Sequence, residues 1–157
     1  MTPRRMRATE AEAVLDLIRA AFAFMAGRID PPSSMHRLTA DAIRQQDRTG
    51  EVWVVAEAGR ILACMVLTPQ PGALYLGKLA VAEEARGRGL SRLMADRAAA
   101  QARGLGLPRV ELQTRVELAE NHAIFRRLGF VETGATAHPG FDRPTSLTFA
   151  RPVDPAG

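Results

Sequence analysis

Residues 73–117 hold the feature that most constrains the fold: two apolar segments separated by a glycine-rich turn and an amphipathic segment. ALYLGKLAVA is typical of a strand, and Gly77 within it indicates a bulge or a close backbone approach. GLSRLMADRAAAQARGLG has apolar residues at helical spacing and ends in glycines, and RVELQTRVE is a further strand. A strand, a turn, a helix and a strand in this order predict a right-handed crossover.

The segments on either side complete an α+β order. Residues 9–27 predict a helix in which Thr9 is the N-cap and Glu12 completes a capping box. Residues 38–50 predict a second helix, and residues 52–69 two strands joined by a turn at 58–60. A helix at 119–129, a strand at 130–137, a loop at 138–144 and a strand at 145–152 follow. We expect one domain over residues 1–157, with a mostly antiparallel sheet.

The composition disfavours several classes of protein. The net charge of +4 is mildly basic, but only 5% of residues are aromatic and no basic run is interleaved with aromatics, so we expect no nucleic-acid partner. No apolar run is long enough for a signal peptide or a membrane span, which predicts a cytoplasmic protein without a membrane partner. The one cysteine, Cys64, lies in an apolar run and is expected to be buried. The three histidines lack metal-binding spacing, so we expect no metal.

The glycine-rich turn EEARGRGLSRLM stands at the entrance of a predicted helix. A helix N-terminus exposes unpaired N–H groups, and glycines let the backbone fold around an anion, for which a diphosphate is a natural guest. An ordinary exposed turn is the alternative. A Walker A loop is excluded because no Gly-Lys-Ser/Thr is present, and Arg92 stands where a dinucleotide fingerprint needs its third glycine.

Two segments carry a family resemblance. KLAVAEEARGRGLSRLM resembles motif A of the GCN5-related N-acetyltransferases, the GNAT family, with Arg86-x-x-Gly89-x-Ser91 in place of the usual pattern ending in Gly or Ala. ENHAIFRRLGFVETG resembles motif B, where Asn121, Leu128, Gly129 and Phe130 match. The element order is similar over about residues 4–151. The resemblance implies a GNAT-like mixed sheet flanked by helices, with a splayed central strand pair forming an acyl-CoA cleft.

The resemblance also implies a site for acetyl-CoA as co-substrate. Its diphosphate would bind the amides of the glycine-rich turn, and its pantetheine arm would pair with the preceding strand, where an amide near Leu79 polarises the thioester carbonyl. Asn121 would bind the pantetheine arm, with a helix N-cap as its equal alternative. Phe125 departs from the family, because many members carry a tyrosine there that protonates the leaving thiolate. The implied cofactor-binding residues are Leu79, Ala80, Val81, Arg86, Gly87, Arg88, Gly89, Leu90, Ser91, Asn121 and Phe125.

A general base is needed because an amine is largely protonated at neutral pH. Glu111 and His138 are the candidates we put forward, and Glu117, His122 and His36 are further options. The main hypothesis is acetyl transfer from acetyl-CoA to a small-molecule or peptide amine by direct attack in a ternary complex. Phe125 motivates the alternative of a non-catalytic CoA-binding or sensing module. Pairing of the last strands of two copies into a homodimer is a further hypothesis.

Overall fold

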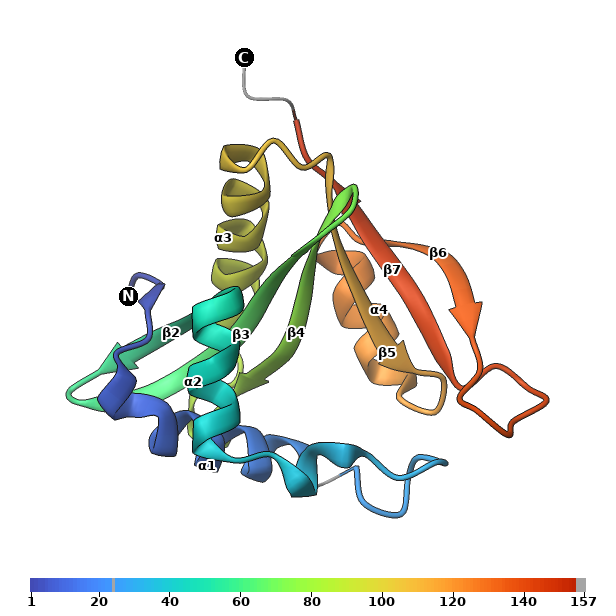
Figure 1. Cartoon of the computed structure of the whole chain (residues 1–157), viewed down its shortest axis with the longest axis horizontal. Helices are drawn as coiled ribbons and strands as arrows, with labels where there is room; N and C mark the ends of the chain where they lie inside the picture. The colour runs from blue at the N-terminus through green and yellow to red at the C-terminus, as the bar shows by residue number, and fades with distance from the viewer. Residues whose placement is uncertain (24, 155–157) are drawn as a thin grey trace.

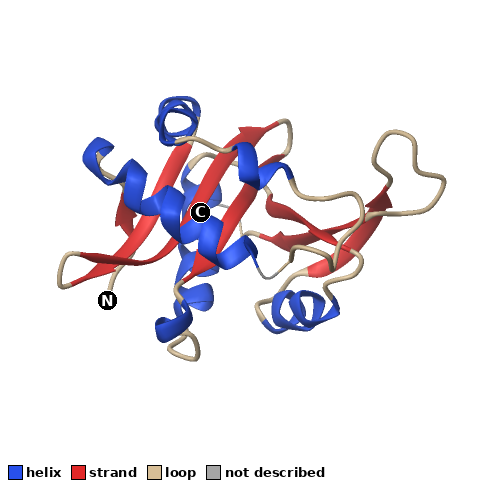
Figure 2. Ribbon diagram, turned by 90° about the horizontal axis from the view of Figure 1, so that it is seen from below, coloured by secondary structure: helices blue, strands red, loops and turns tan. Residues whose placement is uncertain are grey.

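The computed structural model describes residues 1–23 and 25–154. Within them lie four α-helices and seven strands, which form one sheet with helices on both faces (Figures 1 and 2). The helices are α1 (Ala11–Ala23), α2 (Ala40–Thr49), α3 (Leu90–Gly104) and α4 (Ala119–Arg127). The strands are β1 (Arg4–Arg5), β2 (Glu51–Glu57), β3 (Arg60–Gln70), β4 (Ala73–Val81), β5 (Arg109–Arg115), β6 (Val131–Thr136) and β7 (Ser146–Pro152).

The sheet has the order β1-β2-β3-β4-β5-β7-β6. Strands β4 and β5 are parallel, and the other neighbouring pairs are antiparallel. Helix α3 connects β4 to β5, as expected for a parallel pair, which cannot be joined by a tight turn. The predicted α+β class and mostly antiparallel sheet are confirmed.

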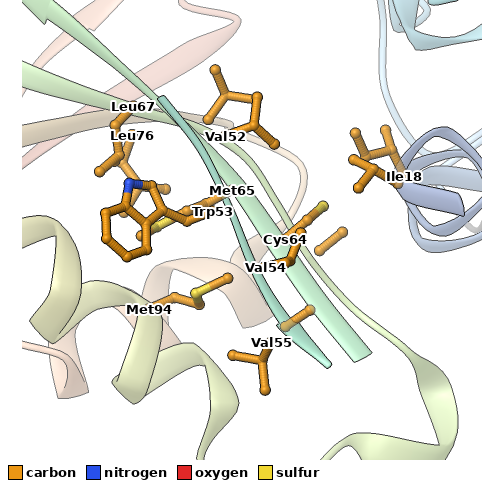
Figure 3. Packing of buried hydrophobic residues seen from close by; sticks show 14 of the residues in the cluster. Ile18, Val52, Trp53, Val54, Val55, Cys64, Met65, Leu67, Leu76 and Met94 are labelled. Carbon is orange, nitrogen blue, oxygen red and sulfur yellow. The ribbon is translucent and has the colours of Figure 1, made fainter. Parts of the chain in front are cut away.

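Strands β2 and β3 form the centre of the core because both of their faces are covered. Val52 and Val54 point toward Ile18 of α1, whereas Trp53 and Val55 lie on the side of Met94 in α3 (Figure 3). All of these side chains are buried. Since complete burial of one such aliphatic side chain contributes about 1.5–3 kcal/mol, this layer holds both helices against the sheet.

The start of α1 differs from the prediction. Thr9 lies inside a short 3-10 helix, Ala8–Glu10, and is not an N-cap. Instead the Glu10 carboxylate accepts a hydrogen bond from the backbone N–H of Arg7 at 2.8 Å and two from Arg4 in β1, at 2.9 and 2.7 Å. The predicted capping box with Glu12 is therefore wrong. The Glu10 carboxylate, two residues earlier, accepts a hydrogen bond from the backbone N–H at the start of the helical segment and links this start to the sheet through Arg4.

Candidate active site

Strands β4 and β5 separate soon after they meet. They pair only through Leu74–Val110 and Tyr75–Glu111, although β4 continues to Val81 and β5 to Arg115. Figure 1 shows the two strands diverging below this contact. Beyond Tyr75, no described strand pairs with the edge of β4 that faces β5. The predicted splayed pair is present, and it leaves backbone donors and acceptors available along one side of β4.

Two cavities adjoin this opening. The first, which we call the strand cavity, has a volume of about 330 Å³ and lies between residues 75–79 of β4, residues 112–115 of β5 and His138. The second, the turn cavity, has a volume of about 390 Å³ and lies between β4, Arg86, Ser91 and α4. The walls of both cavities include Phe22, Met25, Leu79, Asn121 and Phe125. The opening therefore joins two spaces that different parts of the chain enclose.

The glycine-rich turn has the backbone that its glycines permit. Gly87 and Gly89 have φ of 80° and 77°, in the left-handed region, and Gly89 is the N-cap of α3. Arg86 and Ser91 line the turn cavity, whereas Arg88 turns away to pair with Glu57 at 3.0 Å. The Leu90 side chain is buried, so only its backbone can face a ligand. The first amides of α3 have no intrahelical acceptor, as at any helix N-terminus.

The predicted irregularity at Gly77 is a β-bulge. Val66 of β3 is opposite Gly77 and Cys64 is opposite Ala80, so β4 holds one extra residue there. Lys78 within the bulge has φ of 51°, a conformation uncommon for a residue with a side chain. The Cys64 thiol donates to the Lys78 carbonyl at 3.6 Å, and burial raises the pKa of Cys64 to about 12. The expectation of a buried thiol is confirmed.

Helix α4 brings motif B to the opening. Asn121 is the third residue of α4 and Leu118 is its N-cap, so the N-cap alternative for Asn121 is wrong. Asn121 and Phe125 line both cavities. The Phe125 ring packs against the rings of Phe130 and Phe149, with centroids 6.1 and 6.2 Å apart. Phe125 is thus a wall residue with no proton to donate.

The candidate bases lie in different places. Glu111 lines neither cavity, and its carboxylate pairs with Arg109 at 2.9 Å at the closed end of the β4–β5 pair. His138 lines the strand cavity. Its ring Nδ1 forms a short hydrogen bond with the buried hydroxyl of Thr145, which also accepts from the His138 backbone N–H at 2.9 Å. The structure therefore brings His138, and not Glu111, to the opening.

The other acid–base options have structural partners. His122 is buried, with Nε2 3.0 Å from the carbonyl oxygen of Arg115. The Glu117 carboxylate accepts from the Asp30 backbone N–H at 3.1 Å. His36 is exposed, with Nδ1 2.9 Å from the carbonyl oxygen of Ser33. None of the three lines the strand cavity.

Sequence reasoning missed three residues of the strand cavity and its supports. Lys78 is the one lysine of the chain, a signal that could have drawn attention to it. Arg115 lines the cavity from the end of β5, and Thr145 holds His138. Neither of the latter two stands out by type or spacing. Among the described residues, no group of three or more His, Cys, Asp or Glu gathers as a metal site, and no helix is long and apolar enough to cross a membrane.

Comparison with known proteins gives matches over nearly the whole chain. A relative described as "IAA acetyltransferase" from Azospirillum brasilense is 27% identical over 144 residues, which cover 90% of this chain and 92% of the relative. The ribosomal-protein-S18-alanine N-acetyltransferase of Escherichia coli superposes with a TM-score of 0.74 at 18% identity, covering 99% of this chain and 96% of that one. The protein smu.2055 of Streptococcus mutans UA159 superposes with a TM-score of 0.82 at 17% identity, covering 98% and 100%. The model of the acetyltransferase (GNAT) family matches residues 12–130, and the chain belongs to this family.

Proposed function

We propose that the protein transfers an acetyl group from acetyl-CoA to an amine by direct attack in a ternary complex. The observation that carries this proposal is the opening between β4 and β5, where the strand cavity and the turn cavity share Leu79, Asn121 and Phe125. Acetyl-CoA and the amine, each bound in a different cavity, would meet at this opening. Holding both reactants in place lowers the entropic cost of bringing them together.

The turn cavity suits the cofactor. The turn before α3 and the helix N-terminus would offer the amides of residues 87–91 and the positive end of the helix dipole, both of which favour a diphosphate. The Arg86 N–H, also expected to bind it, donates to the Glu83 carbonyl at 3.2 Å. The unpaired edge of β4 at Leu79, Ala80 and Val81 would bind the pantetheine arm as an added strand, and Asn121 would bind its amide groups. The Leu79 backbone N–H would stabilise the oxyanion that forms from the thioester carbonyl.

His138 suits the role of general base. The Thr145 hydroxyl lies 3.4 Å from the Thr136 carbonyl, to which it can donate its single hydrogen. Its lone pairs then accept from the His138 backbone N–H and from Nδ1–H. This arrangement leaves Nε2 without a proton on a ring that lines the strand cavity, as a base requires.

The reaction then balances as follows. The amine nitrogen attacks the thioester carbon and forms a C–N bond, the C–S bond breaks, and the amine proton passes to His138. CoA leaves as a thiolate, whose pKa near 8.5 by analogy with cysteine makes it a fair leaving group without the usual tyrosine. Direct attack is favoured because the Cys64 thiol is buried and its raised pKa, about 12, keeps it protonated.

Thermal unfolding with and without acetyl-CoA tests the cofactor site. Ligand at 100 times its dissociation constant adds about 2.7 kcal/mol, which raises the Tm by several degrees. Gly89→Glu should abolish the shift because it places a carboxylate at the diphosphate site. Gly59→Glu is the matched control, since Gly59 has a similar φ of 78° and open space around it, in the β2–β3 turn.

Release of free CoA thiol with a panel of amines tests the reaction. Turnover supports acetyl transfer, whereas a cofactor-dependent shift without turnover of any amine would favour the non-catalytic alternative that Phe125 motivates. No shift at millimolar acetyl-CoA would contradict both. A cytoplasmic location and a homodimer stay predictions.

A further inference from the structure

The strand cavity has positively charged walls. Lys78 and Arg115 line it together with His138, and the described residues around it include no aspartate or glutamate. A site for a polyamine or another polycation needs carboxylates to pair with the additional ammonium groups. The charge of these walls therefore points to an acceptor that carries a negative group beside its amine.

Lys78 has no ion-pair partner among the described residues. Its side chain is partly buried in the bulge of β4, and desolvation by burial lowers the pKa of Lys78. Burial of a cation without a counter-ion is costly, and an anion bound beside it would relieve that cost. The position is an unusual place for a lysine, because the left-handed φ of 51° is more readily adopted by glycine or asparagine.

Arg115 also keeps unused hydrogen-bonding capacity. Its Nη2 donates to the Pro32 carbonyl at a long 3.5 Å, and its Nη1 is buried without any hydrogen-bond partner among the described residues. The Glu117 carboxylate lines neither cavity. Its Oε2 accepts from the Asp30 backbone N–H, and its Oε1 is buried without a hydrogen-bond partner among the described residues. A guanidinium with free N–H groups matches the planar geometry of a carboxylate.

A third cavity continues from the strand cavity toward the α1–α2 connection. This apolar cavity has a volume of about 640 Å³ and shares Phe22, Met25, Ser33 and Met35 with the strand cavity. Ile29 and Pro32 add to its mostly apolar walls, which also include Arg19 and His36. Among the residues that the structure describes, no carboxylate lines it. A ligand in the strand cavity can therefore extend an apolar group into it, and burial of that group would favour binding.

We propose that the acceptor is an α-amino acid with a large apolar side chain. Its carboxylate binds Lys78 and Arg115, its amine faces the opening between β4 and β5, and its side chain occupies the apolar cavity. This inference rests on the proposed function and adds the class of acceptor to it. The product would be the N-acetylamino acid, formed by the same transfer of one acetyl group with release of CoA.

The test compares acceptors that differ in one group at saturating acetyl-CoA. L-Phenylalanine should have a kcat/KM at least about tenfold above that of L-phenylalaninamide, because the amide cannot form the charge-assisted hydrogen bonds. The amine of L-phenylalaninamide is less basic than that of L-phenylalanine, so a larger fraction of it is unprotonated at neutral pH. This difference favours the amide and therefore works against the expected preference for the acid. Glycine, which lacks the apolar side chain, should also be at least about tenfold worse.

Variants locate the carboxylate. Arg115→Gln and Lys78→Met should each reduce the preference for L-phenylalanine over its amide several-fold. Arg109→Gln is the matched control, an arginine of the same strand that pairs with Glu111 outside both cavities, and it should leave the preference unchanged. Equal or better use of the amide, or of spermidine, would overturn the inference while leaving the proposed acetyl transfer intact.

A binding measurement keeps the inference testable without turnover. N-Acetyl-L-phenylalanine and its amide are titrated calorimetrically into the protein with CoA, or into the protein alone where CoA does not bind. Tighter binding of the acid, lost in Arg115→Gln, supports the carboxylate site even where no amine is acetylated. Equal binding of the two, or no binding of either, overturns it. Failure of the cofactor-dependent thermal shift separately reports failure of the proposed function.

Discussion

The proposed general base, His138, depends on one residue, Thr145, whose hydroxyl contacts it twice. Oγ1 contacts both the backbone N–H and the ring Nδ1 of His138, so this side chain orients the imidazole. In the proposed mechanism it would also select the tautomer with its proton on Nδ1. Thr145 is fully buried and can therefore hold the ring in one arrangement.

His138→Gln should lower kcat about 100-fold, the usual effect of losing a general base. Thr145→Val should lower kcat less and alter the pH dependence of kcat/KM, since the ring can then adopt either tautomer. Thr145→Ser, which keeps the hydroxyl, should restore the wild-type profile. The measurement is kcat/KM between pH 5.5 and 9. An unchanged profile in Thr145→Val would show that the threonine only supports the fold.

Cys64 permits a second residue-scale prediction. Its thiol is buried and its pKa is raised to about 12, so it should react with an alkylating reagent at pH 8 only after denaturation. Cys64→Ala should retain turnover, as direct attack requires no covalent intermediate. The experiment combines labelling followed by mass spectrometry with a turnover assay. Loss of turnover in a folded Cys64→Ala protein would contradict direct attack.

At the scale of elements, the junction of α2 and β2 depends on one glycine. Helix α2 is capped by Thr39, whose hydroxyl accepts from the Ala42 N–H at 3.1 Å, and it ends at Gly50. A Cβ on Gly50 would lie 2.3 Å from the backbone oxygen of Leu67 in β3. Since that oxygen belongs to the sheet, it has little freedom to move.

Gly50→Ala should therefore lower the free energy of unfolding by about 2 kcal/mol or more, the typical cost of overpacking. Gly104→Ala at the end of α3 is the control, because among the described residues no atom outside the adjoining backbone of α3 lies within 4 Å of the added carbon. There alanine should be neutral or stabilise by up to about 1 kcal/mol. Urea unfolding of both variants measures the difference, and equal stabilities would refute the proposed clash.

For the whole molecule, the salt bridge between Arg4 and Glu10 ties β1 to the 3-10 helix that leads into α1. The Nη2–Oε2 distance is 2.7 Å, and the hydrogen bonds from Arg4 lower the pKa of Glu10 to about 2. A lowered folded-state pKa contributes stability above the unfolded value of about 4.3, and this contribution is lost as the pH falls toward 2.

Glu10→Gln should therefore lower the Tm at pH 6 and have little effect near pH 2, where the wild-type carboxylate is itself becoming protonated. Glu12→Gln, at an exposed carboxylate in the first turn of α1, is the control and should change the pH dependence less. Thermal unfolding from pH 2 to 7 provides the comparison. A constant difference between wild type and Glu10→Gln over this range would contradict the pKa of about 2.

At this scale the single domain over residues 1–157 stays a prediction. One sheet runs through all seven strands, and one large core cluster includes residues from α1, α2, α3 and most of the strands. Coincident unfolding transitions measured by tryptophan fluorescence and circular dichroism would support a single cooperative unit.

Local patterns in the sequence determined the order of the elements, an irregularity at Gly77 that the structure shows to be a bulge, the glycine-rich turn and the family. These features depend on neighbouring residues: side-chain periodicity sets helices and strands, and glycine permits the turn. The start of α1 was mispredicted because Thr9 had the local signature of a cap, whereas a long-range bond from Arg4 to Glu10 decided the entrance.

Only the tertiary structure decided which polar groups share the opening. His138 and Glu111 were equal candidates for the general base in the sequence. In the structure, Glu111 lies where β4 and β5 are still paired and forms a salt bridge with Arg109. His138 lies in the β6–β7 loop and lines the strand cavity. Lys78 and Arg115 come from strands that are neighbours in space and 37 positions apart in sequence. Their shared cavity arises from the angle between two strands, which no local pattern specifies because it depends on the packing of the whole sheet.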